Sequence, residues 1–258
     1  MRDKRIVIVM SVCMILGVFM AACICLPGKS KQISEKEVIQ AEFYDESDNT
    51  TMSDIILNDS NLQKINTSEH TIVIDSGHGG SDPGKTKGDV LEKDVNLAIA
   101  LKLEKTLNQL GFNTIMTRTQ DEGLYVSTDT NKKRADLKKR CDIANSSGAD
   151  MMISIHQNSF ENSNVSGAQV FYYTYSAKGK QLAGILQQSM KDNLDTSNKR
   201  VEKQDKTYYL LVHSKIPTVI VECGFLTNQT ELKLLLDEEY QQRIVDSIIV
   251  GINKYFAS

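Results

Sequence analysis

TIVIDSGHGG, residues 71 to 80, joins a short apolar run to a turn rich in glycine. The run has the length and the β-branched residues of a buried strand. From Thr71 onward, apolar runs of this kind alternate with segments of helical periodicity, and this alternation predicts an α/β fold in a single domain. The turn places His78 directly after the strand, where a bulky titratable ring is unusual as packing. His78 is therefore a candidate functional residue.

Periodicity predicts the remaining elements of this domain. Strands are expected at Thr71–Asp75, Asn113–Arg118, Asp150–Ile155, Ala168–Tyr173 and Thr218–Glu222, with a weaker one at Tyr208–Leu211. Helices are expected at Lys93–Leu110, Lys132–Ser146, Ala177–Leu194, Gln229–Leu235 and Glu238–Tyr255.

Residues 1–27 have the composition of a membrane anchor or signal segment. MRDKR is basic, and the 21 residues from Ile6 to Leu26 carry no charge. A helix of this length spans roughly the 30 Å core of a bilayer, which favours an uncleaved anchor with the rest of the chain outside the cytoplasm. A cleaved signal segment, or lipid attachment near Met20–Cys23, is the alternative.

Residues 28–70 are mostly polar, and their apolar residues are too sparse for a core. We expect a flexible stalk here, with a short helix possible at Ile33–Phe43. The formal net charge of the 258 residues is -3, which argues against a general nucleic-acid-binding protein. Only Cys141 and Cys223 lie outside the apolar segment, so a disulfide framework is not expected.

Two further polar residues stand at the same kind of position as His78. His156 follows the third expected strand, in MMISIHQNS, and Glu92 begins the first expected helix, in DVLEKDVN. If their strands are neighbours, the two histidines meet beyond the carboxyl ends of the sheet. Each residue alone is more often structural than functional. Together, two imidazoles and one carboxylate that leave a fourth position to water make a recurring catalytic zinc site.

Glu222 ends the apolar run IPTVIVE. A carboxylate that closes a buried strand is costly unless it is used, and beside an activated water it can act as general base and then general acid. A cap for the following segment or a lysine pair is the alternative. Alternation along the strand places Cys223 on the other face, in the core.

Four separated motifs, VIDSGHGGSDPG, LEKDVNLAIALKLEKTLNQLGFNTIMTR, ANSSGADMMISIHQNS and IPTVIVECGFLTNQTE, occur in this order. With them the chain resembles the zinc-dependent N-acetylmuramoyl-L-alanine amidases of bacterial cell walls. The resemblance implies a mixed sheet of about six strands with helices on both faces, over a catalytic domain at residues 71–258. It also implies one Zn²⁺ per chain, held by His78, Glu92 and His156, with Glu222 as the catalytic residue.

The reaction that the resemblance implies is hydrolysis of the amide between N-acetylmuramic acid and L-alanine in peptidoglycan. The single apolar segment and the short catalytic domain are most similar to the spore-cortex subgroup. That subgroup exposes the muramic acid carboxyl for δ-lactam formation, which germination requires. The implied partners are the glycan strand with its stem peptides and the membrane, and an activating or anchoring protein is a further candidate.

Other features of the sequence leave alternatives open. Asn158, Gln157 and Ser159 are candidates for substrate contact, and the basic run Lys132–Arg140 either meets anionic wall polymers or is a solvated helix face. The chain departs from the family pattern in reading DSGHGG for DPGHGG, and HQNS where HxNA is usual. A zinc carboxypeptidase or deacetylase, or a wall-binding protein with a vestigial site, are competing interpretations.

Overall fold

The computed structural model describes residues 65–258. Within this range no helix combines the length and the apolar character that crossing a membrane requires. The predictions for residues 1–27, for residues 28–64 of the stalk, and for a helix at Ile33–Phe43 lie outside the described residues. The described part begins with the short 3-10 helix η2 (Thr67–Glu69), after which His70 stacks on Phe256 near the C-terminus.

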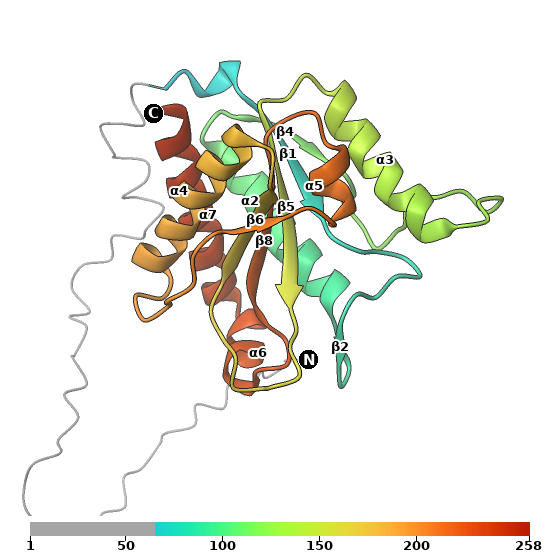
Figure 1. The fold of residues 1–258 in the computed structure, drawn as a ribbon, viewed down its shortest axis with the longest axis vertical. Helices are drawn as coiled ribbons and strands as arrows, with labels where there is room; N and C mark the ends of the chain where they lie inside the picture. The colour runs from blue at the N-terminus through green and yellow to red at the C-terminus, as the bar shows by residue number, and fades with distance from the viewer. Residues whose placement is uncertain (1–64) are drawn as a thin grey trace, which may run out of the picture. The chain divides into compact units, whose positions relative to one another are not determined.

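A six-stranded sheet in the order β4-β1-β5-β8-β6-β7 forms the centre of the fold (Figure 1). Neighbours β4, β1, β5 and β8 are parallel, β6 is antiparallel to β8, and β7 is parallel to β6. The bounds are β1 Thr71–Ser76, β4 Asn113–Met116, β5 Met151–Asn158, β6 Gln169–Tyr173, β7 Lys203–Asp205 and β8 Thr218–Phe225. A small antiparallel ribbon, β2 Thr86–Lys87 with β3 Val90–Leu91, stands apart from this sheet.

The central strands β1, β5 and β8 are buried over nearly their whole length. Parallel strands covered by helices on both faces have near-continuous apolar sequences, which is why these three runs were recognisable. In β1, Ile72 and Ile74 belong to the large core cluster on one face, and Val73 belongs to a second cluster on the other. The sheet therefore separates two cores.

Helices cover both faces of the sheet (Figure 1). The large core lies under α2 (Glu92–Gln109), α4 (Ala177–Asn193) and α7 (Glu238–Phe256). The second core lies under α3 (Lys132–Ser146) and α5 (Tyr209–His213). Helix α6 (Gln229–Leu235) connects β8 to α7. The expected mixed six-stranded sheet with helices on both faces is confirmed.

One predicted strand is wrong. The residues expected as a strand at Tyr208–Leu211 begin helix α5 instead. The Asp205 side chain accepts hydrogen bonds from the backbone N–H groups of Thr207 and Tyr208, and this turn redirects the chain just before the helix. The edge strand β7 is the sixth strand, and its residues Lys-Gln-Asp carry no apolar signal.

Candidate functional site

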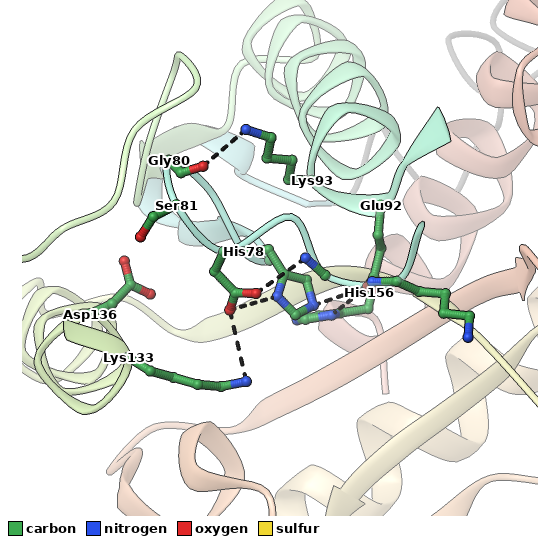
Figure 2. Close-up of polar contacts among 12 residues, drawn as sticks. His78, Gly80, Ser81, Glu92, Lys93, Lys133, Asp136 and His156 are labelled. Atoms are coloured by element: carbon green, nitrogen blue, oxygen red, sulfur yellow. Dashed lines mark hydrogen bonds and ion pairs between the residues drawn. The ribbon is translucent and has the colours of Figure 1, made fainter. Parts of the chain in front are cut away.

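The three expected metal ligands come together at the carboxyl end of the sheet. His78 follows β1, His156 lies on β5, and these strands are parallel neighbours. Glu92 is the first residue of α2. One donor atom from each residue lies within 4.8 Å of the others. Figure 2 shows the three side chains gathered at one point between α2 and the strand ends.

Glu92 is the centre of this cluster. Its Oε1 lies 3.2 Å from His78 Nε2 and 3.0 Å from His156 Nδ1. The backbone N–H of Lys85 donates to its Oε2 at 2.7 Å, and that of Gln157 donates to Oε1 at 3.1 Å. Burial acts to raise the pKa of Glu92, but the hydrogen bonds from the two histidines outweigh it and hold the pKa far below its usual range. The carboxylate is therefore ionised, as a metal ligand must be.

His78 adopts a backbone conformation that is rare for a residue with a side chain. Its φ is 62°, in the left-handed region. The surrounding structure must enforce such a conformation, which costs about 1–3 kcal/mol. Two buried arginines do so, because Arg118 Nε and Arg140 Nη2 donate to the His78 carbonyl at 2.7 and 2.6 Å. The same two side chains also bind the carbonyl of Ser76.

Arg140 in turn is held by acidic groups. It pairs with Asp75 at 2.7 Å and with Asp136 at 2.6 Å. Burial acts to raise the pKa of Asp75, but Arg140 and the Ser154 hydroxyl outweigh it and lower the pKa. The basic run Lys132–Arg140 was expected to be either polymer-binding or solvated, and Arg140 is neither, since it is 1% exposed. The other basic residues of the run are exposed.

Two glycines make room for the ligands. A Cβ atom on Gly77 would lie 2.2 Å from His156 Nε2. A Cβ atom on Gly84 would lie 2.6 Å from both Glu92 Oε2 and His78 Cδ2. Real Cβ atoms do not approach other atoms so closely, so any side chain at either position displaces a ligand.

Asp82 binds the His78 ring through the nitrogen that does not face Glu92. Its Oδ2 lies 3.0 Å from His78 Nδ1, which leaves Nε2 to face Glu92. Carboxylates that accept from the second ring nitrogen of a histidine fix its tautomer and orient it toward a metal. Sequence reasoning missed Asp82, Arg118 and Arg140. Two signals were available in the sequence. Asp82 follows His78 by four residues, and Arg118 ends an apolar run.

Glu222 lies beside the cluster, on β8. It is the register partner of His156 on β5 and is 7% exposed. Its Oε2 is buried and has no hydrogen-bond partner among the described residues. Burial raises the pKa of Glu222 to about 7. Its neighbour Cys223 faces the large core and is fully buried, as strand alternation predicted.

The ligands and Glu222 line a pocket of about 370 Å³. One wall is apolar and comes mainly from α3, α5 and β8. The remaining lining residues are Lys133, Leu137, Gln157, Asn158, Ser159, Tyr208, Tyr209, Leu210 and Ile220. This volume lies within the range of small-molecule pockets, which begins at about 300 Å³.

Asn158 and Gln157, the two residues expected to contact substrate, differ in their exposure. Asn158 is partly exposed at the pocket. Gln157 is 3% exposed, because neighbouring residues of a strand face opposite sides, and its side chain donates to Asn96 at 3.2 Å. Its described contacts hold Asn96 and Glu92 in place. Substrate contact by Asn158 and by Gln157 stays a prediction.

The donor set fits a zinc ion. Zinc in catalytic sites takes three protein ligands, commonly histidines with one carboxylate, and keeps a fourth position open. His78, Glu92 and His156 supply that set, and Asp82 supplies the outer carboxylate that usually accompanies it. The cluster opens onto the pocket, which leaves room for a water and a substrate.

Comparison with known proteins gives a consistent set of similarities. A family model described as N-acetylmuramoyl-L-alanine amidase matches residues 72–254. The germination-specific N-acetylmuramoyl-L-alanine amidase of Bacillus subtilis (strain 168) is 36% identical over 188 residues, which are 72% of this chain and 79% of that protein. The probable cell wall amidase LytH of Staphylococcus aureus is 32% identical over 206 residues, which are 79% of this chain and 64% of that protein.

Among solved structures, the CwlD amidase from Clostridioides difficile in complex with the GerS lipoprotein is similar. It matches with a TM-score of 0.70 and 42% identity, covering 72% of this chain and 98% of that one. An N-acetylmuramoyl-L-alanine amidase from Clostridium difficile 630 matches with a TM-score of 0.65 and 31% identity, covering 73% and 97%.

Proposed function

The chain belongs to the N-acetylmuramoyl-L-alanine amidase family, and from this we propose that it hydrolyses the amide between N-acetylmuramic acid and L-alanine in peptidoglycan with one Zn²⁺. The observation that carries the proposal is the convergence of His78, Glu92 and His156 beside Glu222 in one pocket. An unrelated use of the fold would not require all four positions to hold these residue types.

The three clustered residues would hold the zinc ion. When bound, zinc would lower the pKa of a coordinated water and polarise the scissile carbonyl. Asp82 keeps His78 in the tautomer whose Nε2 faces the cluster. Asn96 Nδ2 lies 3.4 Å from Glu92 Oε1 and holds that carboxylate against the histidines.

Glu222 would move the proton. Its raised pKa of about 7 lies near neutral pH, where a general base and acid works best. The unpartnered Oε2 is the atom available to take a proton from the attacking water. The same atom then returns the proton to the departing alanine nitrogen, so that the muramic acid carboxyl and an intact stem peptide are released.

We also propose that the activity serves spore-cortex maturation. Support comes from the 36% identity to a germination-specific amidase and from the 42% identity to the CwlD amidase. Release of the muramic acid carboxyl is the step that would precede δ-lactam formation. Because that CwlD structure is a complex with a lipoprotein, a lipoprotein partner is part of the proposal. The peptidoglycan substrate places the catalytic domain outside the cytoplasm, and residues 1–27 would anchor or export it.

Mass spectrometry of reaction products tests the proposed chemistry. The purified full chain is incubated with purified peptidoglycan, with zinc and with a chelator. The expected products are glycan strands with free muramic acid carboxyls and stem peptides that begin with intact L-alanine, in the zinc sample only. Cleavage within the stem peptide would indicate a peptidase, and release of acetate would indicate a deacetylase. Zinc binding without any cleavage would indicate a binding protein.

A further inference from the structure

A second, polar pocket adjoins the metal pocket. Its volume is about 310 Å³. Lys133 lines both pockets, so the two pockets are neighbours at this residue. The second pocket is lined by Gly79, Ser81, Asp82, Tyr125, Lys132, Lys133 and Asp136. Figure 2 shows Lys133, Ser81 and Asp136 on the side of His78 that faces away from Glu92.

The acidic residues of this second pocket already have partners. Asp82 binds the His78 ring and the backbone N–H of Gly84. Asp136 binds Arg140 and the backbone N–H of Leu124. Both carboxylates are therefore already bound to groups of the protein that hold the site in place.

The two lysines are less engaged. Lys133 Nζ lies 3.9 Å from Asp82 Oδ2, beyond hydrogen-bond distance, and its side chain is 71% exposed. Lys132 Nζ lies 5.2 Å from the centre of the Tyr125 ring. The Tyr125 hydroxyl bonds Ser81 Oγ at 2.7 Å, and since one of the two O–H groups is used in this bond, the other remains as a neutral donor on the same wall. Lys133 therefore has only a long ion pair with Asp82, and Lys132 a contact with an aromatic ring, so both ammonium groups can still accept an anion as a hydrogen-bond partner.

Helix stability does not explain these lysines. They are the first two residues of α3, and the first turn contains no acidic residue. Cations at the positive end of a helix are unfavourable by about 0.3–1 kcal/mol each. Residues that oppose local stability are expected at functional positions.

Building on the proposed amidase function, we propose that Lys132 and Lys133 bind a carboxylate of the stem peptide and so select acidic stem peptides. Asp82 contacts both Lys133 and His78. An extended peptide advances about 3.3–3.6 Å per residue. In the proposed binding mode, the scissile amide lies at the metal cluster and a carboxylate on the residue that follows the alanine lies in the second pocket.

Paired substrates test this selectivity. Two muramyl peptides are compared, one with a free carboxylate on the second stem residue and one with that carboxyl amidated. The variants Lys133→Gln and Lys132→Gln are compared with the unaltered full chain. Lys139→Gln is the control, since it removes one charge from an exposed site on the same helix that lines neither pocket.

Each pocket variant is expected to lose about tenfold in kcat/KM on the acidic substrate, mainly through KM, because a charge-assisted hydrogen bond is lost. The amidated substrate should change less than twofold, and the control should change neither. Equal losses on both substrates would overturn the proposal and assign Lys133 to positioning Asp82. Unchanged kinetics on the acidic substrate would also overturn it.

A binding measurement separates this proposal from the proposed function. Calorimetry with the free stem peptide needs no cleavage. The acidic peptide should bind about tenfold more tightly than the amidated one, and both lysine variants should abolish the difference. If the unaltered chain cleaves neither substrate but shows this difference, the amidase function fails and the carboxylate pocket stands. Equal binding of the two peptides refutes the pocket.

Discussion

Arg140 Nη2 donates to the backbone carbonyl of His78 at 2.6 Å, so a side chain from α3 holds the backbone of a proposed metal ligand in the loop after β1. Arg140 is itself held by the buried carboxylate of Asp75. The backbone conformation of His78 therefore depends on a buried ion pair, Arg140 with Asp75.

Replacing Arg140 should destabilise the whole domain. Arg140→Met leaves the Asp75 carboxylate buried without its cation, and removal of one partner from a buried pair costs about 3–5 kcal/mol. Urea unfolding of the metal-free protein measures this loss. Lys139→Met, at the exposed position before it, should stay within about 0.5 kcal/mol. Equal stability of the two variants would refute the structural role of Arg140.

Replacing Asp82 should weaken metal binding without unfolding the protein. Asp82→Asn removes the charged acceptor from the His78 ring, and the loss of such an outer carboxylate lowers metal affinity about 10–100-fold. Competition with a zinc chelator of known affinity measures the change. Asp89→Asn removes the same charge from an exposed position in the β2–β3 turn and should leave the affinity unaltered. Unaltered affinity in Asp82→Asn would exclude the supporting role.

Gly77 should tolerate no side chain. In Gly77→Ala the added Cβ would overlap the His156 ring, so zinc stoichiometry should fall well below one per chain. Gly184→Ala is the matched control, because a Cβ there meets only Glu202 Cδ at 3.9 Å, within helix α4. The control should bind zinc fully and gain up to about 1 kcal/mol of stability. Full zinc binding by Gly77→Ala would show that the ring can move aside.

Glu222→Gln should keep zinc and lose turnover. The amide has nearly the same shape as the carboxylate but cannot take a proton from water, and general acid–base catalysis contributes about 10²–10⁴-fold. Metal analysis and product release, measured on the same preparation, test both parts. A variant with more than a tenth of the original turnover would remove Glu222 from the proton-transfer role.

The same substitution should stabilise the metal-free protein in a pH-dependent way. The pKa of Glu222 rises from 4.5 to about 7 on folding, so the unfolded state ionises first as pH rises. Below about pH 4.5 the Glu222 carboxyl is neutral in both the folded and the unfolded state, so it does not lower the free energy of unfolding. As pH rises from there through about 7, the unfolded state ionises more readily than the folded state, and the free energy of unfolding falls.

Glu222→Gln should therefore gain about 2–3 kcal/mol between pH 5 and pH 8 relative to the unaltered chain, since each pKa unit corresponds to about 1.36 kcal/mol. Denaturant unfolding of chelator-treated protein at both pH values measures this gain. A stability difference that does not change with pH would show that the folded carboxyl ionises near its ordinary pKa.

Sequence reasoning located the elements whose patterns are strong. The buried parallel strands β1, β5 and β8 are apolar because both faces are covered, and their ends identify His78, His156 and Glu222. Whether β1 and β5 are neighbours is a property of the sheet order, which no local pattern contains. From the sequence alone, His78 and His156 could therefore be predicted to meet only on the condition that their strands are neighbours.

The residues that hold the site in place were harder to predict than the strands that carry it. Arg140 ends a run in which the other basic residues are exposed, whereas its own side chain is buried against Asp75. Long-range pairs of this kind leave no periodicity. The strand expected at Tyr208–Leu211 failed for a local reason, because the turn made by the Asp205 side chain outweighs the β-propensity of the tyrosines.

The wide spacing of the three proposed metal ligands along the chain determines when the metal site can form. Glu92 and His156 are separated by 64 positions in the chain, and they meet only after β1, β5 and α2 have packed together. A chain in which these elements have not yet packed cannot bring the three side chains together, so the proposed metal site forms only as the domain folds.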